Sequence, residues 1–316
     1  MIIAHSASEI QPNAASVATV GTFDGVHCGH NAIIHRLRES AKERSARSVV
    51  LTFDPHPRSV VGPDRSRPDI LTSREEKSAL FQRMGIDLLV VIPFTIEFSH
   101  LSAEEFVREW LVSAIGADHM VVGHDHHFGR GRQGSVEELE SLGKRFGFSV
   151  EQVPAVLDKG EVVSSSLIRA ALGAGDVQRA SDLLGYRYRL TGIVVPGDRR
   201  GATLGYATAN LKPLPEEKLI PARGVYVVHG VWGTTSRYGM MNIGVRPTVA
   251  DGLRETIEVH FFGHQGDLYG TELRVEFIAR LREEKRFPSL EALVQQLEED
   301  RKESHRILER MNELAT

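Results

Sequence analysis

The densest group of reactive side chains lies between Gly21 and His30, in the sequence GTFDGVHCGH. His27 and His30 are three positions apart, so they share one face if a helix begins there. A helix N-terminus offers unpaired N–H groups and a positive dipole end, which attract phosphate, and Gly29 lets the backbone approach it closely. Imidazoles can donate hydrogen bonds to a phosphate as charge builds up during its transfer. The segment therefore favours phosphate chemistry.

Two other interpretations of this histidine pair are a metal site and a solvated helix start. No cluster of carboxylates and histidines accompanies the pair, which disfavours a metal. The strand and glycine-rich turn expected before it favour phosphate binding over a solvated helix start.

A second group lies in GDRRGATLGYATAN, residues 197–210. Thr208 and Asn210 are two positions apart in an extended segment, so their side chains point to one face. A hydroxyl and an amide beside a glycine loop suit Mg²⁺ and phosphate oxygens, although glycine turns that only join strands are the common alternative. Downstream, Glu258 lies on the polar side of a predicted strand. It is either a solvated carboxylate or the base that accepts a substrate hydroxyl proton.

A third group is SSSLIR, residues 164–169. Ser165 can cap a helix, and free N–H groups with Arg169 one turn along would hold a polyphosphate. An ordinary N-cap explains the serines equally well.

The elements expected around these groups divide the chain. In the first half, strands at 16–20, 48–53, 88–92 and 120–122 alternate with helices after 30, at 68–83 and at 103–115, and Ser73 and Glu76 form a capping box. This alternation predicts parallel βαβ units, an α/β doubly wound domain. Because ligands bind at the carboxyl ends of such strands, segments 21–30, 53–57 and 123–129 are expected to meet at one site.

After Ser164 the pattern changes. Two short helices are expected at 165–172 and 176–184, followed by strands at 189–195, 224–232, 238–243, 256–262 and 272–278. Short strands at this spacing predict a small antiparallel β-barrel. A long C-terminal helix begins at Ser289, with an inward stripe of Leu290, Leu293, Val294, Leu297, Ser304, Leu308 and Met311. The expected domains are 1–186 and 187–316.

These motifs resemble a known family. The segment 21–30 resembles the signature of the nucleotidylyltransferase superfamily, in the version of the bacterial bifunctional riboflavin kinase/FMN adenylyltransferase (FAD synthetase) family. Segments 52–57 and 122–129 are similar to its flavin-side segments, and 164–169 resembles its Ser-Ser-Thr-x-x-Arg motif. Residues 204–210 resemble its Pro-Thr-Ala-Asn motif, and Glu258 falls at the position of its catalytic base. The resemblance covers about Val17 to Asp300.

The resemblance implies two reactions. The second domain would transfer the ATP γ-phosphate to the ribityl hydroxyl of riboflavin, giving FMN, and the first would join AMP from ATP to FMN, giving FAD and pyrophosphate. The implied catalytic residues are His27, His30, Arg169 and Glu258. ATP and its phosphates are expected at Gly21, Phe23, Asp24, Gly29, Ser165, Ser166, Gly201, Thr208 and Asn210, with Mg²⁺ on Thr208 and Asn210. Flavin is expected at His56, Asp125 and Phe128.

Two positions depart from the family pattern. His126 stands where the family has an aromatic residue, so flavin binding would be weakened or altered if that ring packs near the isoalloxazine. Ala207 stands where the family has proline, which predicts a looser loop and weaker binding of ATP and Mg²⁺.

Composition limits the partners. With 316 residues, 38 Lys and Arg and 42 Asp and Glu, the net charge is -4, which argues against a broad nucleic-acid-binding surface. The single cysteine, Cys28, fits a reducing cytoplasm, and neither a signal peptide nor a membrane segment is expected. The expected partners are riboflavin, FMN and ATP, and homo-oligomerisation stays open.

Three rival functions remain at this point. One is a single-activity enzyme in which one domain only binds flavin. Another is a flavin sensor or scaffold with both sites silent, disfavoured because His27, His30, Arg169, Asn210 and Glu258 are all present. The third, a different adenylyl- or cytidylyltransferase, leaves the barrel half unexplained.

Overall fold

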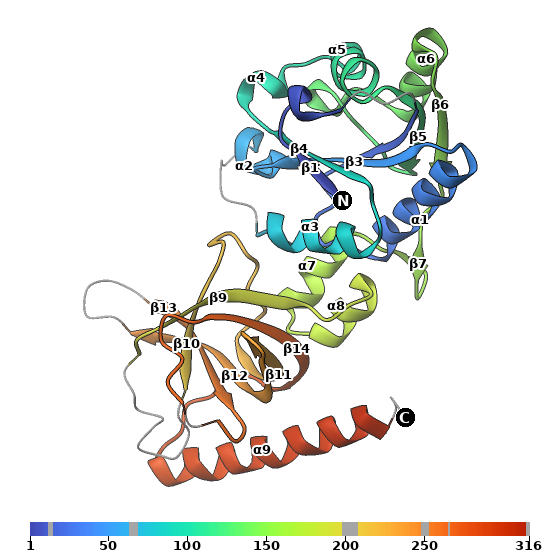
Figure 1. Cartoon of the computed structure of the whole chain (residues 1–316). Coiled ribbons are helices and arrows are strands. Elements are labelled where there is room, and N and C mark those ends of the chain that lie inside the picture. The colour runs from blue at the N-terminus through green and yellow to red at the C-terminus, as the bar shows by residue number, and fades with distance from the viewer. Residues whose placement is uncertain (12–14, 63–68, 198–207, 248–252, 265, 314–316) are drawn as a thin grey trace. The chain divides into compact units, whose positions relative to one another are not determined.

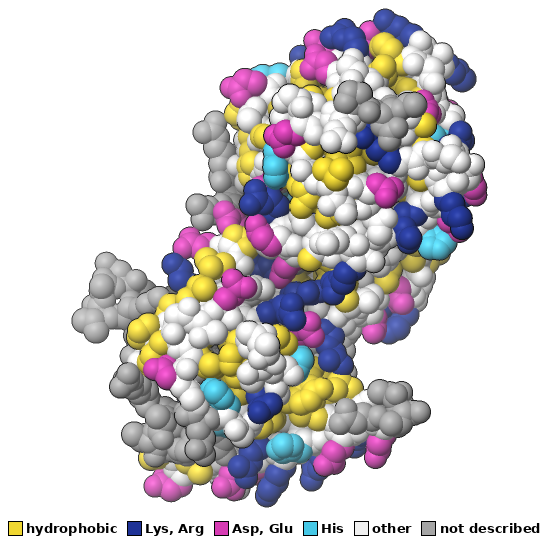
Figure 2. Space-filling view, viewed as in Figure 1, with side chains coloured by type: hydrophobic (Ala, Val, Ile, Leu, Met, Phe, Trp, Pro, Cys, Tyr) yellow, Lys and Arg dark blue, Asp and Glu magenta, His cyan; other side chains and the backbone are white. Residues whose placement is uncertain are grey.

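The computed structural model describes residues 1–11, 15–62, 69–197, 208–247, 253–264 and 266–313 (Figure 1). The chain forms two compact units, Met1–Ser165 and Ser166–Thr316, and each is described by itself. The expected domain division at residue 186 stays a prediction. On the face shown in Figure 2, side chains of both charge signs are interspersed, which accords with the small net charge.

The first unit is built on a six-stranded parallel sheet in the order β1-β4-β3-β2-β5-β6. Its strands are β1 (Ile2–Ala4), β2 (Ser16–Val20), β3 (Arg47–Asp54), β4 (Leu88–Pro93), β5 (Ala117–Gly123) and β6 (Ser149–Val153). A separate hairpin pairs β7 (Leu157–Asp158) with β8 (Glu161–Val162). The predicted doubly wound domain is confirmed, although the sequence pattern did not predict β1 or β6.

Helices cover both faces of this sheet, with α1 and α3 on one side and α5 and α6 on the other (Figure 1). The helices are η1 (Ala7–Glu9), α1 (Cys28–Glu43), α2 (Pro57–Val61), α3 (Arg74–Arg83), α4 (Ile96–Ser99), α5 (Ala103–Phe106), the π-helical η2 (Val107–Ile115), η3 (Arg130–Arg132) and α6 (Val136–Phe146). The single helix predicted at 103–115 is therefore α-helical only in its first part, and α6 was not predicted.

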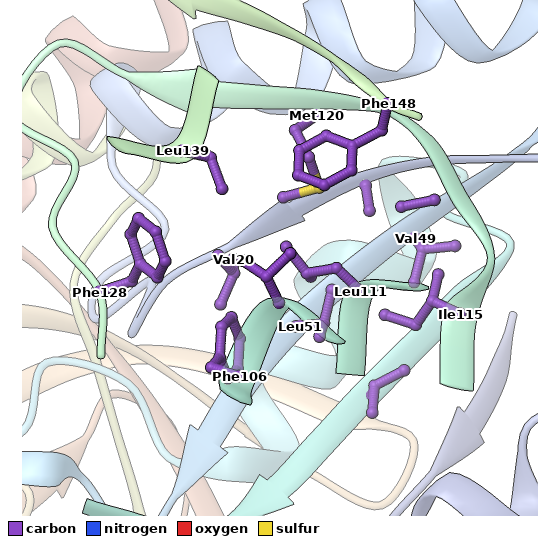
Figure 3. Packing of buried hydrophobic residues seen from close by; sticks show 14 of the residues in the cluster. Val20, Val49, Leu51, Phe106, Leu111, Ile115, Met120, Phe128, Leu139 and Phe148 are labelled. Atoms are coloured by element: carbon purple, nitrogen blue, oxygen red, sulfur yellow. The ribbon is translucent and has the colours of Figure 1, made fainter. Parts of the chain in front are cut away.

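One apolar layer fixes the positions of the strand ends. Figure 3 shows side chains of β2, β3 and β5 packed against α5, η2 and α6, among them Val20, Leu51, Met120, Phe106, Leu111 and Leu139. Each such side chain stabilises the fold by about 1.5–3 kcal/mol when it is fully buried. The rigid layer holds the carboxyl ends of three adjacent strands, from which the loops of the candidate site emerge.

The predicted start of one helix is wrong. The expected helix at 68–83 is α3, which begins only at Arg74, because Ser73 and Glu76 form a capping box at its start. The backbone amides of Leu71 and Thr72 donate to Asp24 Oδ1, so they are engaged outside the helix. A contact between residues 47 positions apart therefore overrides the local helical pattern.

The second unit contains a closed six-stranded antiparallel barrel in the order β10-β13-β12-β11-β14-β9, which confirms the predicted barrel. Its strands are β9 (Arg189–Val195), β10 (Ala209–Pro213), β11 (Gly224–Trp232), β12 (Thr235–Pro247), β13 (Leu253–Phe261) and β14 (Glu272–Arg282). Helices α7 (Ser165–Gly173) and α8 (Val177–Leu184) precede it, as predicted.

The C-terminal helix α9 (Leu290–Glu313) packs against β12 and β14. Leu308 is buried in a cluster with Val227 and Ala279, and Ser304 is fully buried, as the predicted stripe requires. The stripe is wrong at Leu290, which is 55% exposed. Further along the helix, Asp300 accepts hydrogen bonds from Arg282 of β14.

Candidate active sites

The loop after β2 leads directly into α1, and His27 is the N-cap residue of that helix. Its Nδ1 accepts a hydrogen bond from the backbone N–H of His30 at 3.3 Å, so the proton of the neutral ring resides on Nε2. The two imidazoles stack, with centroids 3.6 Å apart and 19° between their planes. The buried ring of Phe23 packs edge-on against His30 at 5.1 Å. The prediction that both histidines share one face at a helix start is confirmed.

Burial determines the charge of both rings. It lowers the pKa of His27 to about 4, against the opposing influence of Asp24 and Asp125. Burial, His27 and Lys77 together hold the pKa of His30 well below its usual range. Among the described residues, the buried Nδ1 of His30 has no hydrogen-bond partner. Both imidazoles are therefore neutral at pH 7, and a neutral imidazole interacts with a ligand through hydrogen bonds rather than through charge.

The histidine loop is held by the segment that precedes α3. Asp24, 2% exposed, accepts hydrogen bonds at Oδ1 from the backbone N–H groups of Leu71 at 2.9 Å and Thr72 at 3.1 Å. Thr72 Oγ1 in turn accepts from the N–H of Gly25 at 3.0 Å. Asp24 was expected to contact ATP, and in the structure its carboxylate binds the protein backbone. It gives the loop its shape.

Two glycines of the signature have packing roles in addition to the one expected. A Cβ atom on Gly29 would lie 3.1 Å from His27 Cε1 and 3.4 Å from the carbonyl oxygen of Val163. A Cβ atom on Gly21 would lie 3.3 Å from the ring of Phe23. Glycine at both positions therefore gives the aromatic rings of the loop room to pack.

The serine motif starts α7. Ser165 Oγ donates to the carbonyl oxygen of Asp24 at 2.8 Å, so this hydroxyl also holds the histidine loop. Ser166 and Arg169 follow in the first turns of α7 and belong to the second unit. An N-terminal helical turn carrying an arginine retains the features that suit a polyphosphate.

Lys77 is a functional candidate that sequence reasoning missed. This lysine lies on the buried face of α3, 8% exposed, and its Nζ donates to the carbonyl oxygen of Thr22 at 2.8 Å and to Thr52 Oγ1 at 3.4 Å. Burial lowers its pKa, against the influence of Asp24 and Asp54. The sequence does indicate that Lys77 faces inward, because it lies three and four positions before the buried Leu80 and Phe81 and so shares their face of the helix.

A small pocket of about 40 Å³ opens at the carboxyl end of β3. Lys77, His56 and Asp54 are among the residues that line it. His56, expected to contact flavin, is the N-cap of α2, and its Nδ1 accepts from the N–H of Arg58 at 3.1 Å. Asp54 pairs with the half-exposed Arg74 at 3.8 Å. The expected convergence of segments 21–30 and 53–57 is borne out here, since Asp24 also lines this pocket.

Aromatic rings continue from β3 toward the segment after β5. Consecutive ring centroids 5.5 to 6.2 Å apart connect Phe53, Phe94, Phe98, Phe106 and Phe128. Phe128, expected to contact flavin, is 7% exposed and belongs to the apolar core. This row gives the carboxyl edge of the sheet an apolar lining of the kind that flat ring systems favour.

The segment after β5 places Asp125 and His126 side by side in the chain. The side chain of Asp125 is 79% exposed, and its charge acts on His27, which joins this segment to the histidine loop. The ring of His126 stacks on Phe128 with centroids 5.7 Å apart and 18° between the planes. Burial lowers the pKa of His126 to about 4, so the ring is neutral at pH 7.

In the second unit, three polar side chains form a row across adjacent strands. Glu258 on β13 pairs in register with Asn210 on β10 and with Asn242 on β12. Thr208 Oγ1 donates to Glu258 Oε2 at 3.3 Å. The neighbours of Glu258 on β13, Ile257 and Val259, are buried. The expected trio of Thr208, Asn210 and Glu258 therefore comes together, and Asn242, which had no expected role in the site, joins them through the register of β12 with β13.

Gly197 lies close to this row. A Cβ atom on Gly197 would overlap the side-chain amide of Asn210. Gly201, expected to bind phosphate, and Ala207, the departure from proline, lie outside the described residues.

Comparison with known proteins assigns a family to each part of the chain. The FAD synthetase family model matches residues 9–167, and the riboflavin kinase family model matches residues 184–308. The bifunctional riboflavin kinase/FMN adenylyltransferase of Pseudomonas fluorescens is 42% identical over 277 residues, 88% of each chain. The protein of the same name from Escherichia coli K12 is 36% identical over 290 residues, 92% of this chain and 91% of the relative.

A solved structure shares the whole architecture. A Streptococcus pneumoniae crystal structure described as a macrolide-efflux protein matches with a TM-score of 0.87 and 32% identity, covering 96% of this chain and 98% of that chain. In the described part of this chain, no helix has the length and apolar character needed to cross a membrane. The two family models and the relatives, which match along about nine tenths of their length, show that this chain belongs to the bifunctional riboflavin kinase/FMN adenylyltransferase family, whose members make FMN from riboflavin and FAD from FMN.

Proposed function

We propose that His27 and His30 stabilise the phosphate that is transferred in the adenylylation of FMN. The observation that carries this assignment is the stacked, neutral histidine pair at the N-terminus of α1. The FMN phosphate oxygen attacks the α-phosphorus of ATP, the bond to pyrophosphate breaks, and negative charge grows on the oxygens in between. His27 Nε2–H and the N-terminal amides of α1 donate to this charge, and Ser165, Ser166 and Arg169 at the start of α7 are the proposed ligands of the triphosphate.

The flavin of this reaction is assigned to the carboxyl edge of the sheet. His56 and Asp125 lie on loops that follow β3 and β5, and Phe128 belongs to the row of aromatic rings between them. The aromatic row supports the isoalloxazine by apolar contact, and Asp125 supplies an exposed polar group beside the histidines. The proposed contribution to ATP binding through the shape of the histidine loop comes from Gly21, Phe23, Asp24 and Gly29.

In the second unit, Glu258 is the proposed base of riboflavin phosphorylation. It accepts the proton of the ribityl hydroxyl as the new bond from oxygen to the γ-phosphorus forms and the bond to ADP breaks. Its hydrogen bond from Thr208 and its register with Asn210 support this role, because they aim the carboxylate at the place where phosphate ligands gather. Gly201 belongs to the same proposed ATP site.

The donor set in this unit fits Mg²⁺. Thr208 Oγ1 and the Asn210 amide oxygen are hard oxygen ligands beside a carboxylate, and Mg²⁺ at a nucleotide is held by one or two protein ligands together with phosphates. Thr208 and Asn210 would hold the ion, which neutralises phosphate charge when bound. Glu258 keeps its role in moving the proton.

The same assignment of the two reactions leads to a proposed domain division, compartment and set of partners. The proposed division of labour is residues 1–186 for adenylylation and residues 187–316 for phosphorylation. The proposed compartment is the cytoplasm, supported by the lone Cys28. Nucleic acid is not a proposed partner, and a homo-oligomer is compatible with both sites.

One incubation of the full-length chain with riboflavin, ATP and Mg²⁺, followed by chromatography, tests the assignments. His30→Ala should accumulate FMN, with FAD formation slowed about 10²–10³-fold. Glu258→Gln should slow FMN formation about 10²–10⁴-fold and still convert added FMN to FAD. The exposed residues His35 on α1 and Glu272 on β14 provide the matched controls His35→Ala and Glu272→Gln. Normal FAD formation by His30→Ala, or normal FMN formation by Glu258→Gln, would disprove the corresponding assignment.

A further inference from the structure

A charged side chain from α3 contacts the loop that carries the two histidines. Lys77 Nζ donates to the carbonyl oxygen of Thr22 at 2.8 Å, and Thr52 Oγ1 donates to the same oxygen at 3.1 Å. Thr22 belongs to the loop between β2 and α1, whereas Lys77 lies 55 positions further along the chain. Burying an ammonium group costs free energy unless it is well paired. This lysine is therefore an expensive means of holding one carbonyl oxygen in place.

The loop needs to be held because its backbone is strained. Phe23 and Val26 have φ angles of +48° and +39°, in the left-handed region that residues other than glycine rarely adopt. Such conformations cost about 1–3 kcal/mol each and persist only where the surroundings enforce them. The residue after Thr22 is Phe23, whose ring packs against His30. The Thr22 carbonyl is thereby linked to the His30 imidazole through one residue, Phe23.

We propose that Lys77 is a positioning residue for adenylyl transfer, which holds the Thr22 carbonyl so that Phe23 supports His30, and whose charge adds positive potential behind the phosphate-binding end of α1. This inference rests on the proposed role of His27 and His30. It adds a residue from α3 that acts on the reaction through the loop.

The charged groups around His30 make the proposal measurable. His27 faces His30 from the N-cap and Lys77 faces it from α3, and both lower its pKa in addition to burial. Asp24 in the loop and Asp54 at the end of β3 act on Lys77, and Asp125 acts on His27. Removing the charge of Lys77 raises the pKa of His30. A substitution that loosened the loop but kept a positive charge at position 77 would still lower the pKa of His30.

The test compares Lys77→Met, Lys77→Arg and the control Lys42→Met in the full-length protein. Lys42 lies in the last turn of α1 and is exposed. Lys77→Met should lower kcat for FAD formation from FMN and ATP about 10–100-fold, with riboflavin phosphorylation unchanged. It should also move the acid limb of the pH–rate profile upward by about one pH unit. Lys77→Arg should keep the acid limb and have an intermediate kcat, and Lys42→Met should behave as wild type.

Wild-type kcat and a wild-type acid limb in Lys77→Met overturn the proposal. If thermal unfolding shows that Lys77→Met does not fold, Lys77→Arg decides. In Lys77→Arg the longer guanidinium group cannot hold the Thr22 carbonyl in the same place, while the positive charge remains. A reduced kcat with a wild-type acid limb in this variant therefore supports the proposal, and a wild-type kcat overturns it. His30→Ala, measured in parallel, distinguishes a failure of the proposed function from a failure of the inference about Lys77. Retained FAD formation in His30→Ala refutes the proposed function, whereas its loss together with an unaffected Lys77→Met refutes only the inference.

Discussion

The imidazoles of His27 and His30 stack at 3.6 Å, and the ring of His27 also caps the helix that carries His30. One side chain thus satisfies a helix amide and supports its neighbour. Because Nδ1 is used by the cap, Nε2–H is the donor that His27 can offer to phosphate. The arrangement depends on both rings being neutral, and this dependence leads to a first prediction about pH.

His27→Asn should make the stability of the first unit less sensitive to acid. The unfolded His27 takes up a proton near pH 6.5, whereas the folded one does so only near pH 4. Between pH 6.5 and pH 4 the unfolded chain therefore binds a proton that the folded chain does not bind. The free energy of unfolding falls by about 3 kcal/mol as the pH drops through this range. Asparagine keeps the N-cap and does not titrate. Urea unfolding at several pH values measures the difference, and equal slopes in the two proteins would contradict the prediction.

Gly197→Ala should impair phosphorylation without impairing folding. The new Cβ atom would overlap the amide of Asn210, which can rotate away at little cost to the fold. A ligand displaced by about 1 Å can cost roughly 100-fold in rate, so kcat/KM for FMN formation should fall 10–100-fold while FAD formation from FMN is unchanged. Gly173→Ala is the matched control, because among the described residues beyond its chain neighbours and its own helix backbone no atom lies within 4 Å of its Cβ position. A normal rate in Gly197→Ala would show that Asn210 can move without consequence.

Local patterns predicted most of the elements and the outline of both sites. The predicted bounds of β2, β9 and β11 agree with the structure, because alternation or a short apolar run is decided by neighbouring residues. His27 and His30 were found for the same reason, since three-residue spacing at a helix start fixes their common face.

Contacts between distant segments could not be predicted. Whether Lys77 is a solvated helix residue or a buried donor to Thr22 depends on how α3 packs, which periodicity does not determine. Asn242 joins the phosphorylation row only through the register of β12 with β13. The helix at 68–83 was predicted to begin too early because Asp24, 47 positions before Leu71, takes its amide.

His126→Phe should stabilise the first unit. Among the described residues, the buried Nε2 of His126 has no hydrogen-bond partner, and leaving such an atom unsatisfied costs about 1–3 kcal/mol. Phenylalanine keeps the stacking on Phe128 and removes that atom. The free energy of unfolding should rise by about 1 kcal/mol. The KM for FMN, measured on the same variant, should fall if this ring supports the isoalloxazine. Lower stability in His126→Phe would indicate that Nε2 has a partner.

Asp300→Ala should detach α9 from the barrel. The Asp300 carboxylate, 4% exposed, accepts from Arg282 Nε at 3.0 Å and from its terminal nitrogen at 2.8 Å, and Gln296 donates to it at 2.9 Å. Removing the carboxylate takes the ion-pair partner from Arg282, whose side chain is 18% exposed and keeps its hydrogen bond to the Glu283 carbonyl oxygen, which costs about 1.5–3 kcal/mol. Glu303→Ala is the control, because its ion pair with Arg306 is solvent-exposed and contributes less than about 1 kcal/mol. Urea unfolding compares the two variants, and limited proteolysis should cleave within α9 of Asp300→Ala alone. Equal stability losses would mean that the apolar contacts of Leu308, rather than this ion pair, hold the helix in place.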